Sequence, residues 1–256
     1  MSTGYVVRFV LTMTVIVALL LAFMYEMWKG QFQINEAIFN KRAILSSVES
    51  YLGTDANGNP LEADKISDEE VLKIFEETME QKVLNMKGEE LTPDVVESQY
   101  GITGGKAENI DMAKEKKKPE EERLLPLYIF SSDKGTSCIF SVRGSGLWDD
   151  IWGSVAVKDD LSTIAGTAFD HKGETPGLGA EIKDNPSFPA RFVGKKIYDS
   201  AGKLVAVNVV KGKAKKGDPH SVDGISGATV TATGVQEMLK RGIAYYEPYI
   251  NSLKMK

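Results

Sequence analysis

Hydroxyl side chains and glycines crowd the segment 223–233, which reads Asp-Gly-Ile-Ser-Gly-Ala-Thr-Val-Thr-Ala-Thr. Four hydroxyl residues lie within eight positions there: Ser226, Thr229, Thr231 and Thr233. The two glycines allow main-chain N–H groups to approach a ligand closely. A helical pattern follows, and the free N–H groups and dipole of a helix N-terminus attract phosphate. The segment therefore predicts a hydroxyl-bearing turn beside a phosphate site.

A serine hydrolase is one alternative, because Gly224–Ala228 is one residue short of the G-x-S-x-G nucleophile elbow. An α/β-hydrolase needs its triad histidine after the serine. Both histidines of the chain, His171 and His220, precede Ser226, and the preceding stretch 211–218 is basic rather than strand-like. This order of residues argues against a hydrolase. For the turn taken alone, a plain Gly/Ser/Thr-rich loop remains the alternative.

A second motif favours a more specific interpretation. Residues 174–181 read Glu-Thr-Pro-Gly-Leu-Gly-Ala-Glu, and Gly-Leu-Trp precedes them at 146–148. Both segments resemble the flavin-contacting segments of the C-subunit family of the sodium-translocating NADH:quinone reductase. The turn at 223–229 resembles that family's flavinylation motif, an acidic residue and two others before Ser/Thr-Gly-Ala-Thr. The resemblance covers roughly residues 143–256. At the N-terminus it extends only to the kind of segment, a membrane anchor.

The resemblance implies that Thr229 carries FMN through a phosphoester bond. Ser226 would donate a further hydrogen bond, and Gly227 and Ala228 complete the turn. A separate flavin transferase that uses FAD and a divalent metal would make the attachment, because no base is adjacent to Thr229 in sequence. Asp223 would place a carboxylate near that metal; the alternative is an Asx-turn residue that organises the loop.

Two other segments would hold the flavin ring by the same resemblance. In the segment that Glu174 opens, Gly177 and Gly179 would permit a close backbone approach, and Leu178 would give an apolar platform. Thr175 would hydrogen-bond the polar edge of the ring. Leu147 and Trp148 would cover the ring. The alternatives are a core or loop-packing role for Trp148 and a simple turn at Pro176-Gly177.

Composition sets bounds on the function. At 256 residues the chain has room for one sizeable domain plus appendages. Its net charge of −5 argues against a nucleic-acid-binding surface. Cys138, the only cysteine, lies in an apolar alternating run and predicts a buried strand residue. One cysteine and two separated histidines argue against a zinc or iron–sulfur site. No G-x-G-x-x-G follows a predicted strand, so no dinucleotide site is predicted.

Residues 9–25 carry no charged side chain and predict a membrane-spanning helix, at the short end of the usual length. Tyr25 and Trp28 would anchor it at the interface. A cleaved signal peptide is the alternative, but the bulky segment 23–28 has no A-x-A-like cleavage site. Arg8 before the span favours a cytoplasmic N-terminus. The rest of the chain would then face the periplasm or the outer surface.

The following region, residues 31–123, is predicted to be helical with a charged linker. Residues 31–52 show helical spacing, and Asp55–Pro60 reads as a turn. Ser67–Glu70 is a capping box that opens a second helix, with this predicted buried stripe: Val71, Ile74, Phe75 and Met79. The mixed-charge run in 104–123 has almost nothing to bury and predicts a mobile loop or linker. A docking patch for a partner is the alternative there.

From Leu124 the pattern changes to short apolar runs separated by turns, which predicts these strands: 125–130, 138–142, 151–157, 164–169 and 204–210. Residues 185–192 predict a short helix, and Thr233–Gln236 is a capping box for a C-terminal helix that Pro248 ends or kinks. Its predicted buried side chains are Val235, Met238, Leu239 and Ile243. We expect an α+β fold, with an anchor at 1–30 and an FMN-binding domain at 124–256 whose mainly antiparallel sheet is flanked by helices.

The sequence thus predicts a membrane-anchored FMN carrier. By resemblance it would pass electrons within the sodium-translocating reductase in the bacterial inner membrane, with the large membrane B-subunit as neighbour and NADH bound elsewhere. The G-subunit of the related Rnf complex is a close alternative. An anchored extracytoplasmic binding module without flavin is the alternative from another class.

Overall fold

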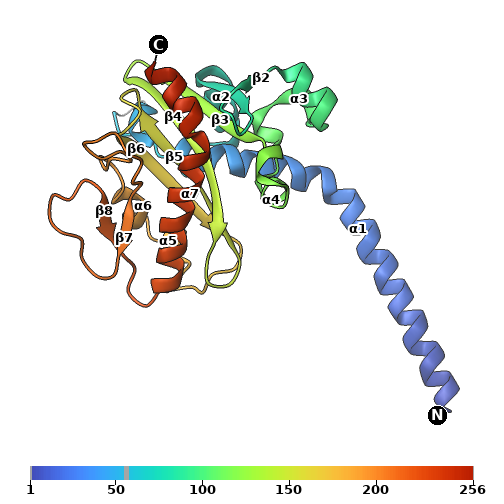
Figure 1. Ribbon diagram of the computed structural model, residues 1–256. Coiled ribbons are helices and arrows are strands. Elements are labelled where there is room, and N and C mark those ends of the chain that lie inside the picture. Colours follow the sequence, from blue (N-terminus) through green and yellow to red (C-terminus); the bar gives the residue numbers. More distant parts are fainter. Residues whose placement is uncertain (1, 55–57, 256) are drawn as a thin grey trace. The chain divides into compact units, whose positions relative to one another are not determined.

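The computed structural model describes residues 2–54 and 58–255, so part of the turn predicted at Asp55–Pro60 lies outside the described residues. The chain forms two compact units, residues 1–40 and 41–256, each of which is described by itself (Figure 1). Helix α1, Thr3–Ser46, begins in the first unit. Strands, loops and six further α-helices make up the described part of the second.

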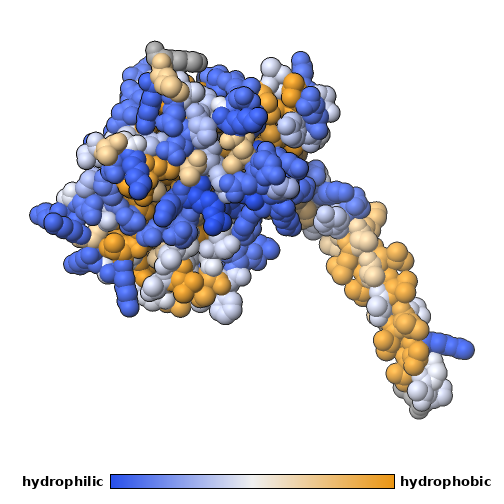
Figure 2. Space-filling model, viewed as in Figure 1, coloured by the Kyte–Doolittle hydropathy of each residue, from blue (hydrophilic) through white to orange (hydrophobic). Residues whose placement is uncertain are grey.

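Helix α1 contains the predicted span. Its most apolar 18-residue window has a mean hydropathy of 2.5, so the helix is long and apolar enough to cross a membrane. Figure 2 shows hydrophobic residues along much of its visible face. The helix continues through the region predicted from Gln31 onward, and a short 3₁₀ turn, Glu49–Tyr51, follows it. An α-helix satisfies its own backbone hydrogen bonds, as a segment in lipid must.

The second unit is built on a six-stranded antiparallel sheet with the order β2-β1-β3-β4-β5-β6. Its strands are β1 Met79–Leu84, β2 Glu90–Leu91, β3 Leu125–Ser132, β4 Gly135–Ser145, β5 Asp150–Lys158 and β6 Ile164–His171. Strands β3 to β6 confirm four predicted strands, and Cys138 on β4 is buried as expected. The predicted α+β fold with a mainly antiparallel sheet is confirmed.

Sequence reasoning missed β1, β2 and β8. The helix that Ser67 caps is α2, Asp68–Thr78, and the capping box is present. Met79, predicted as part of its buried stripe, instead begins β1, whose partner β3 is distant in sequence. The strand predicted at 204–210 shortens to β7, Asn208–Val210, which pairs in parallel with β8, Ser221–Asp223. These short strands depend on partners that no local pattern reveals.

Three short helices complete the body, besides α4 described below: α3 Pro93–Tyr100, α5 Glu181–Asp184 and α6 Ser187–Ala190. Helix α6 lies within the helical segment predicted at 185–192. Its Phe188 packs with Phe169 of β6 and with Phe192, at ring-centroid distances of 5.8 and 5.5 Å. This cluster places the chain that precedes β7 against the end of the sheet.

The C-terminal helix α7, Thr229–Lys254, begins five residues earlier than predicted, because its N-cap is Ala228 rather than Thr233. The capping box predicted at Thr233–Gln236 is wrong, because Thr233 lies inside the helix and its hydroxyl donates to the Thr229 carbonyl at 2.9 Å. Pro248 does not end the helix, which continues past it to Lys254. The predicted buried side chains are confirmed: Val235, Met238, Leu239 and Ile243.

Helix α7 packs across the sheet along β4, as Figure 1 shows. Two glycines allow this close approach. A Cβ at Gly144 would lie 2.7 Å from the Met238 Cβ, and one at Gly242 would lie 2.5 Å from the Val142 Cγ1. Both distances are shorter than a carbon–carbon contact allows. The sheet therefore fixes the N-terminus of α7 relative to the β4–β5 hairpin.

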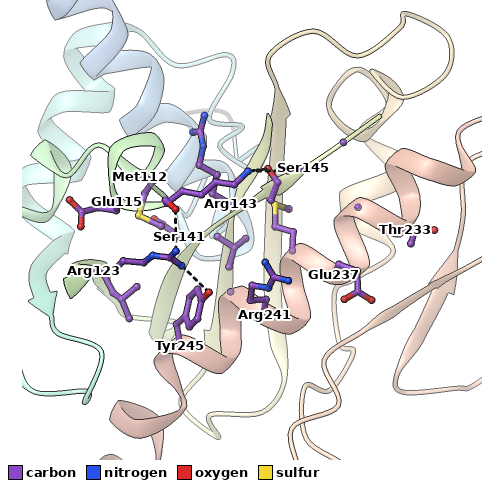
Figure 3. Close-up of a pocket in the computed structure, with 18 of the residues that line it drawn as sticks. Met112, Glu115, Arg123, Ser141, Arg143, Ser145, Thr233, Glu237, Arg241 and Tyr245 are labelled. Carbon is purple, nitrogen blue, oxygen red and sulfur yellow. Dashed lines mark hydrogen bonds between the residues drawn. The ribbon is translucent and has the colours of Figure 1, made fainter. Parts of the chain in front are cut away.

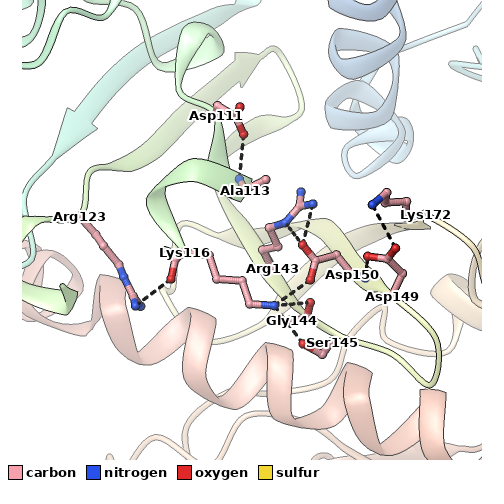
Figure 4. Close-up of polar contacts among 10 residues, drawn as sticks. All are labelled: Asp111, Ala113, Lys116, Arg123, Arg143, Gly144, Ser145, Asp149, Asp150 and Lys172. Atoms are coloured by element: carbon pink, nitrogen blue, oxygen red, sulfur yellow. Dashed lines mark hydrogen bonds and ion pairs between the residues drawn. The ribbon is translucent and has the colours of Figure 1, made fainter. Parts of the chain in front are cut away.

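The charged segment 104–123 is folded against the domain, so the prediction of a loop with almost nothing to bury is wrong. It includes helix α4, Met112–Glu115, and Glu115 is only 3% exposed. The Glu115 carboxylate accepts from the Leu124 N–H at 2.9 Å and pairs with Lys118 at 2.7 Å. Lys116 donates to Asp150 at 2.8 Å and to Ser145 at 2.9 Å (Figure 4). A partner-docking role for the segment stays a prediction.

The domain boundaries predicted at residues 30 and 123 also stay a prediction. Strands β1 and β2, from the 31–123 region, nevertheless belong to the same sheet as β3 to β6.

Candidate functional site

The turn before α7 is tight and exposed. The Ala228 N–H donates to the Ile225 carbonyl at 3.2 Å, and Gly227 has a φ of 77°. This left-handed backbone favours glycine at the third position of a turn. Ser226, Gly227 and Thr229 are exposed, while Ala228 is buried and anchors the turn. The turn therefore presents its hydroxyl groups to solvent.

Thr229 is the first residue of α7, and no side chain caps this end of the helix. The first N–H groups of a helix have no intrahelical acceptor. In a 26-residue helix they add to a dipole whose positive end attracts an anion. The structure therefore places the exposed Thr229 hydroxyl at the uncapped start of α7, and the phosphate site predicted there stays a prediction.

Glu174 connects the three predicted segments and is only 5% exposed. Its Oε1 accepts from the Trp148 N–H at 2.9 Å, and its Oε2 accepts from the Thr231 hydroxyl at 2.5 Å. Its own N–H donates to His171 Nδ1 at 3.1 Å. The carboxylate thus joins the β4–β5 turn and the loop after β6 to the first turn of α7.

The hydrogen bonds to Glu174 favour its charged form. Burial by itself raises the pKa of this carboxyl group, but the hydrogen bonds from Thr231 and from the backbone N–H groups of residues 147–149 outweigh it. The net pKa of Glu174 therefore lies below its ordinary value. An ionised Glu174 held by these hydrogen bonds organises the three segments, while its predicted contact with the cofactor stays a prediction.

Two glycines make room for this carboxylate. A Cβ at Gly146 would clash with Glu174 Oε1, and a Cβ at Gly179 would clash with its Oε2. A Cβ at Gly227 would lie 2.6 Å from Leu178 Cδ2. The segment 174–179 therefore contacts the turn before α7. Only glycine fits at positions 146, 179 and 227. Gly177, with a φ of 73° and open space around it, forms the exposed turn of residues 175–178.

Trp148 is 69% exposed, so its alternative interpretation as a core residue is wrong. Its indole N–H donates to the Thr175 hydroxyl at 3.0 Å. This hydrogen bond links the β4–β5 turn to the loop after β6. Leu147 and Leu178 are also largely exposed, at 51% and 42%. These three exposed apolar side chains lie on two loops that the Trp148–Thr175 hydrogen bond joins, and we call them the open platform, defined as Leu147, Trp148 and Leu178.

Asp223 organises its own loop. Its carboxylate accepts from the Ala214 N–H at 2.7 Å, across the loop between β7 and β8. Arg191 holds the same loop by donating to the carbonyls of Asp223 and Gly224 at 2.9 and 3.0 Å. These contacts support the loop-organising alternative, while a role in metal-assisted attachment stays a prediction. Among the residues that the structure describes, no group of three or more His, Cys, Asp or Glu side chains could hold a metal ion.

Sequence reasoning missed the roles of two residues of this arrangement, Thr231 and Arg191, and it quoted Gly146 only as part of the Gly-Leu-Trp segment. Thr231 stood out only as one of four hydroxyls, and nothing local marked it as the buried one. Arg191 is 32 residues from the turn it supports. Their roles depend on contacts between distant segments.

A cavity of about 520 Å³ opens next to the turn, between α4, β4 and α7 (Figure 3). Val230 and Thr233, from the first turns of α7, line one end of it. Met112, Leu124 and Met238 give it apolar walls, and Glu237 and Arg241 project from α7. Its size falls within the range of small-molecule sites.

Comparisons with known proteins agree on one family. The family model described as "FMN-binding domain" matches residues 146–244. The chain is 35% identical to the Na(+)-translocating NADH-quinone reductase C-subunit of Vibrio campbellii over 208 residues, 75% of this chain and 73% of the relative. It is 36% identical to the C-subunit of Neisseria meningitidis, over 73% of this chain and 75% of the relative. A match to the Pseudomonas aeruginosa C-subunit, at 46% identity, spans 46% of each chain, about half the length of that relative.

Solved structures agree with these matches. A C-subunit of the Na(+)-translocating NADH-quinone reductase from Parabacteroides distasonis superimposes with a TM-score of 0.69 at 33% identity, over 87% of this chain and 96% of that one. The NqrC protein of Shewanella oneidensis superimposes with a TM-score of 0.65 at 28% identity, over 85% and 99% of the two chains. With its FMN-binding domain, its exposed hydroxyl turn and relatives aligned over most of its length, the chain belongs to the C-subunit family of the Na(+)-translocating NADH-quinone reductases.

Proposed function

We propose that this protein is a membrane-anchored electron carrier that holds FMN covalently on Thr229 and works inside a sodium-translocating NADH:quinone reductase. The observation that carries the proposal is the position of Thr229. Thr229 is the first residue of the uncapped helix α7, and its hydroxyl is exposed. The turn just before it contains Gly227, where a side chain would clash with Leu178. The names of the relatives support the choice of complex.

The residues present fit FMN. Free N–H groups at the start of α7 suit its phosphate, and the Ser226 hydroxyl lies in the same exposed turn. The platform of Leu147, Trp148 and Leu178 suits the apolar faces of the ring, and Thr175 holds Trp148 in place. The bound flavin would supply reversible one- and two-electron chemistry, while these residues fix its position.

The attachment would be a transfer of FMN from FAD. A bond would form between Thr229 Oγ1 and the FMN phosphorus, and the pyrophosphate bond to AMP would break. The hydroxyl proton would leave with AMP or pass to solvent, and no electron would be gained or lost. Because no base contacts Thr229 among the described residues, a separate flavin transferase would activate the hydroxyl with a divalent metal, with Asp223 close to the metal.

The same proposal assigns the location and the neighbours. Helix α1 would cross the bacterial inner membrane once, with Arg8 on the cytoplasmic side and the FMN domain in the periplasm. The membrane B-subunit would exchange electrons with the flavin, other subunits would bind NADH and reduce quinone, and the assembly would export sodium. The G-subunit of the Rnf complex stays the close alternative, although the relatives named above are C-subunits of the reductase. The match to an FMN-binding domain argues against an anchored module without flavin.

The test is the intact mass of the full-length chain co-expressed with a flavin transferase. We expect a gain of one FMN less water, which disappears in Thr229→Ala. Thr233→Ala is the matched control, because it removes another exposed hydroxyl one turn along the same helix. Retention of the added mass in Thr229→Ala, or no added mass while a known flavinylated protein is modified in the same cells, would contradict the proposal.

A further inference from the structure

The cavity beside α7 contains two charged groups that the fold leaves unused. Arg241 and Glu237 lie one turn apart on α7 and are both exposed. Neither side chain has a hydrogen bond or an ion pair within the described part of the chain. Figure 3 shows both on the α7 side of the cavity. A guanidinium and a carboxylate side by side can bind a ligand edge that carries both acceptors and a donor.

The other cations around the cavity already have structural partners. Lys116 and Arg143 both contact the Asp150 carboxylate, at 2.8 and 2.9 Å (Figure 4). Arg123 donates to the Tyr245 hydroxyl at 3.0 Å and to the carbonyls of Lys116 and Lys118 at 3.1 Å. These contacts hold the segment 112–123 as a wall of the cavity. Among the described residues that line the cavity, they leave Arg241 as the cation available to a ligand.

The cavity is within reach of a group carried on Thr229. On an α-helix with a rise of about 1.5 Å per residue, Glu237 lies about 12 Å and Arg241 about 18 Å along the axis from Thr229. Thr233 and Glu237 follow Thr229 at intervals of one turn on the same helix face. About eight covalent bonds separate Thr229 Oγ1 from the ring of an attached FMN, which extended gives about 10 Å. The ring would then begin beside Glu237.

We propose that this cavity is a second seat for the isoalloxazine ring of the FMN on Thr229, apart from the open platform of Leu147, Trp148 and Leu178. Arg241 donates to the carbonyl and nitrogen acceptors of the pyrimidine edge, and Glu237 accepts from its N–H. Met112, Leu124 and Met238 contact the apolar part of the ring. The inference rests on the proposed function.

The two seats differ in their exposure to water. The platform side chains are 42–69% exposed and would leave the ring open to a partner. The cavity encloses a ligand on three sides, by α4, β4 and α7, and Met238 in its wall is only 2% exposed. A cation beside the pyrimidine edge also favours the ring when it carries negative charge after reduction. Movement between the seats would therefore couple the charge of the ring to its accessibility.

Methyl NMR of the methionines tests this proposal directly. The full chain, with ¹³C-methyl methionine, is compared before and after flavinylation, and the signals are assigned with Met112→Leu and Met238→Leu. We expect the ring current of the flavin to shift the Met112 and Met238 methyl signals several-fold more than that of Met79, which lies on β1 away from the cavity. Arg241→Ala should reduce both shifts, whereas Lys240→Ala, an exposed neighbour that does not line the cavity, should not.

The outcomes separate this inference from the proposed function. If the mass shows attached FMN but the two methyl signals move no more than that of Met79, the second seat does not exist and the carrier function stands. If Arg241→Ala and Lys240→Ala reduce the shifts equally, Arg241 does not bind the ring. If no FMN attaches to Thr229, the proposed function fails, and the inference fails with it.

Discussion

The Thr231 hydroxyl donates a 2.5 Å hydrogen bond to the Glu174 carboxylate, which ties the first turn of α7 to the loop after β6. Both side chains are buried, at 1% and 5% exposure. Two residues that are 57 positions apart thus set the distance between the attachment turn and the segment 174–179.

Removing this hydrogen bond should destabilise the protein. In Thr231→Val the buried carboxylate loses its hydroxyl donor while the side-chain shape is kept. We expect the free energy of unfolding to fall by about 1–3 kcal/mol, measured by urea denaturation of the full-length chain. Thr233→Val is the matched control, because Thr233 is exposed and bonds only to its own helix, so its change should stay within about 0.5 kcal/mol. Equal effects of the two variants would contradict this role for Thr231.

The lowered pKa of Glu174 predicts a pH dependence of stability. Its folded-state pKa lies below the unfolded value of about 4.3, so its ionised form stabilises the fold above that pH. This stabilisation is lost as the pH falls through the folded pKa. We expect the difference in unfolding free energy between wild type and Glu174→Gln to be largest near neutral pH and to shrink below about pH 4.3. A difference that stays constant over that acid range would show that the charge of Glu174 has no such role.

Gly227 should tolerate no side chain. Its φ of 77° alone makes alanine cost about 1–2 kcal/mol, and the new Cβ would also lie 2.6 Å from Leu178 Cδ2. We expect Gly227→Ala to lower stability by at least that amount and to reduce the yield of attached FMN, measured by calorimetry and intact mass. Gly173→Ala is the control, because no heavy atom lies within 4 Å of its added Cβ and its φ is not in the left-handed region.

The double variant Gly227→Ala, Leu178→Ala separates the two causes. It removes the contact with Leu178 but keeps the unfavourable φ, so it should recover only part of the stability. Full recovery would mean that the backbone conformation at Gly227 is not strained for alanine.

Lys116 should keep the segment 112–123 closed over the β4–β5 hairpin. In Lys116→Ala the segment loses its contacts with Asp150 and Ser145. The side chains are partly exposed, so we expect less than about 1 kcal/mol of global destabilisation, but several-fold faster amide hydrogen exchange within 112–123. Lys117→Ala is the control, because the described structure shows no side-chain contact for its neighbour Lys117. Unchanged exchange in Lys116→Ala would mean that other contacts hold the segment.

The sequence by itself determined the parts of this protein that local pattern encodes. An uncharged run gave the apolar helix, alternation gave strands β3 to β6, and Ser67 with Glu70 gave the start of α2. The hydroxyl turn and the Glu174–Glu181 segment pointed to the family, because the spacing of these residues is fixed by backbone geometry over a few positions.

Only the tertiary structure decided how these parts meet. The Thr231–Glu174 hydrogen bond joins the start of α7 to a loop 57 positions away, and the strand β1 that follows α2 pairs with the distant β3. The charged segment 112–123 resembles a solvated linker, yet its Glu115 is buried because Lys118 and the Leu124 N–H satisfy the carboxylate. The cavity exists because three distant elements enclose it. Each of these features depends on contacts between residues far apart in the chain, and the free energy of such contacts leaves no local signature in sequence.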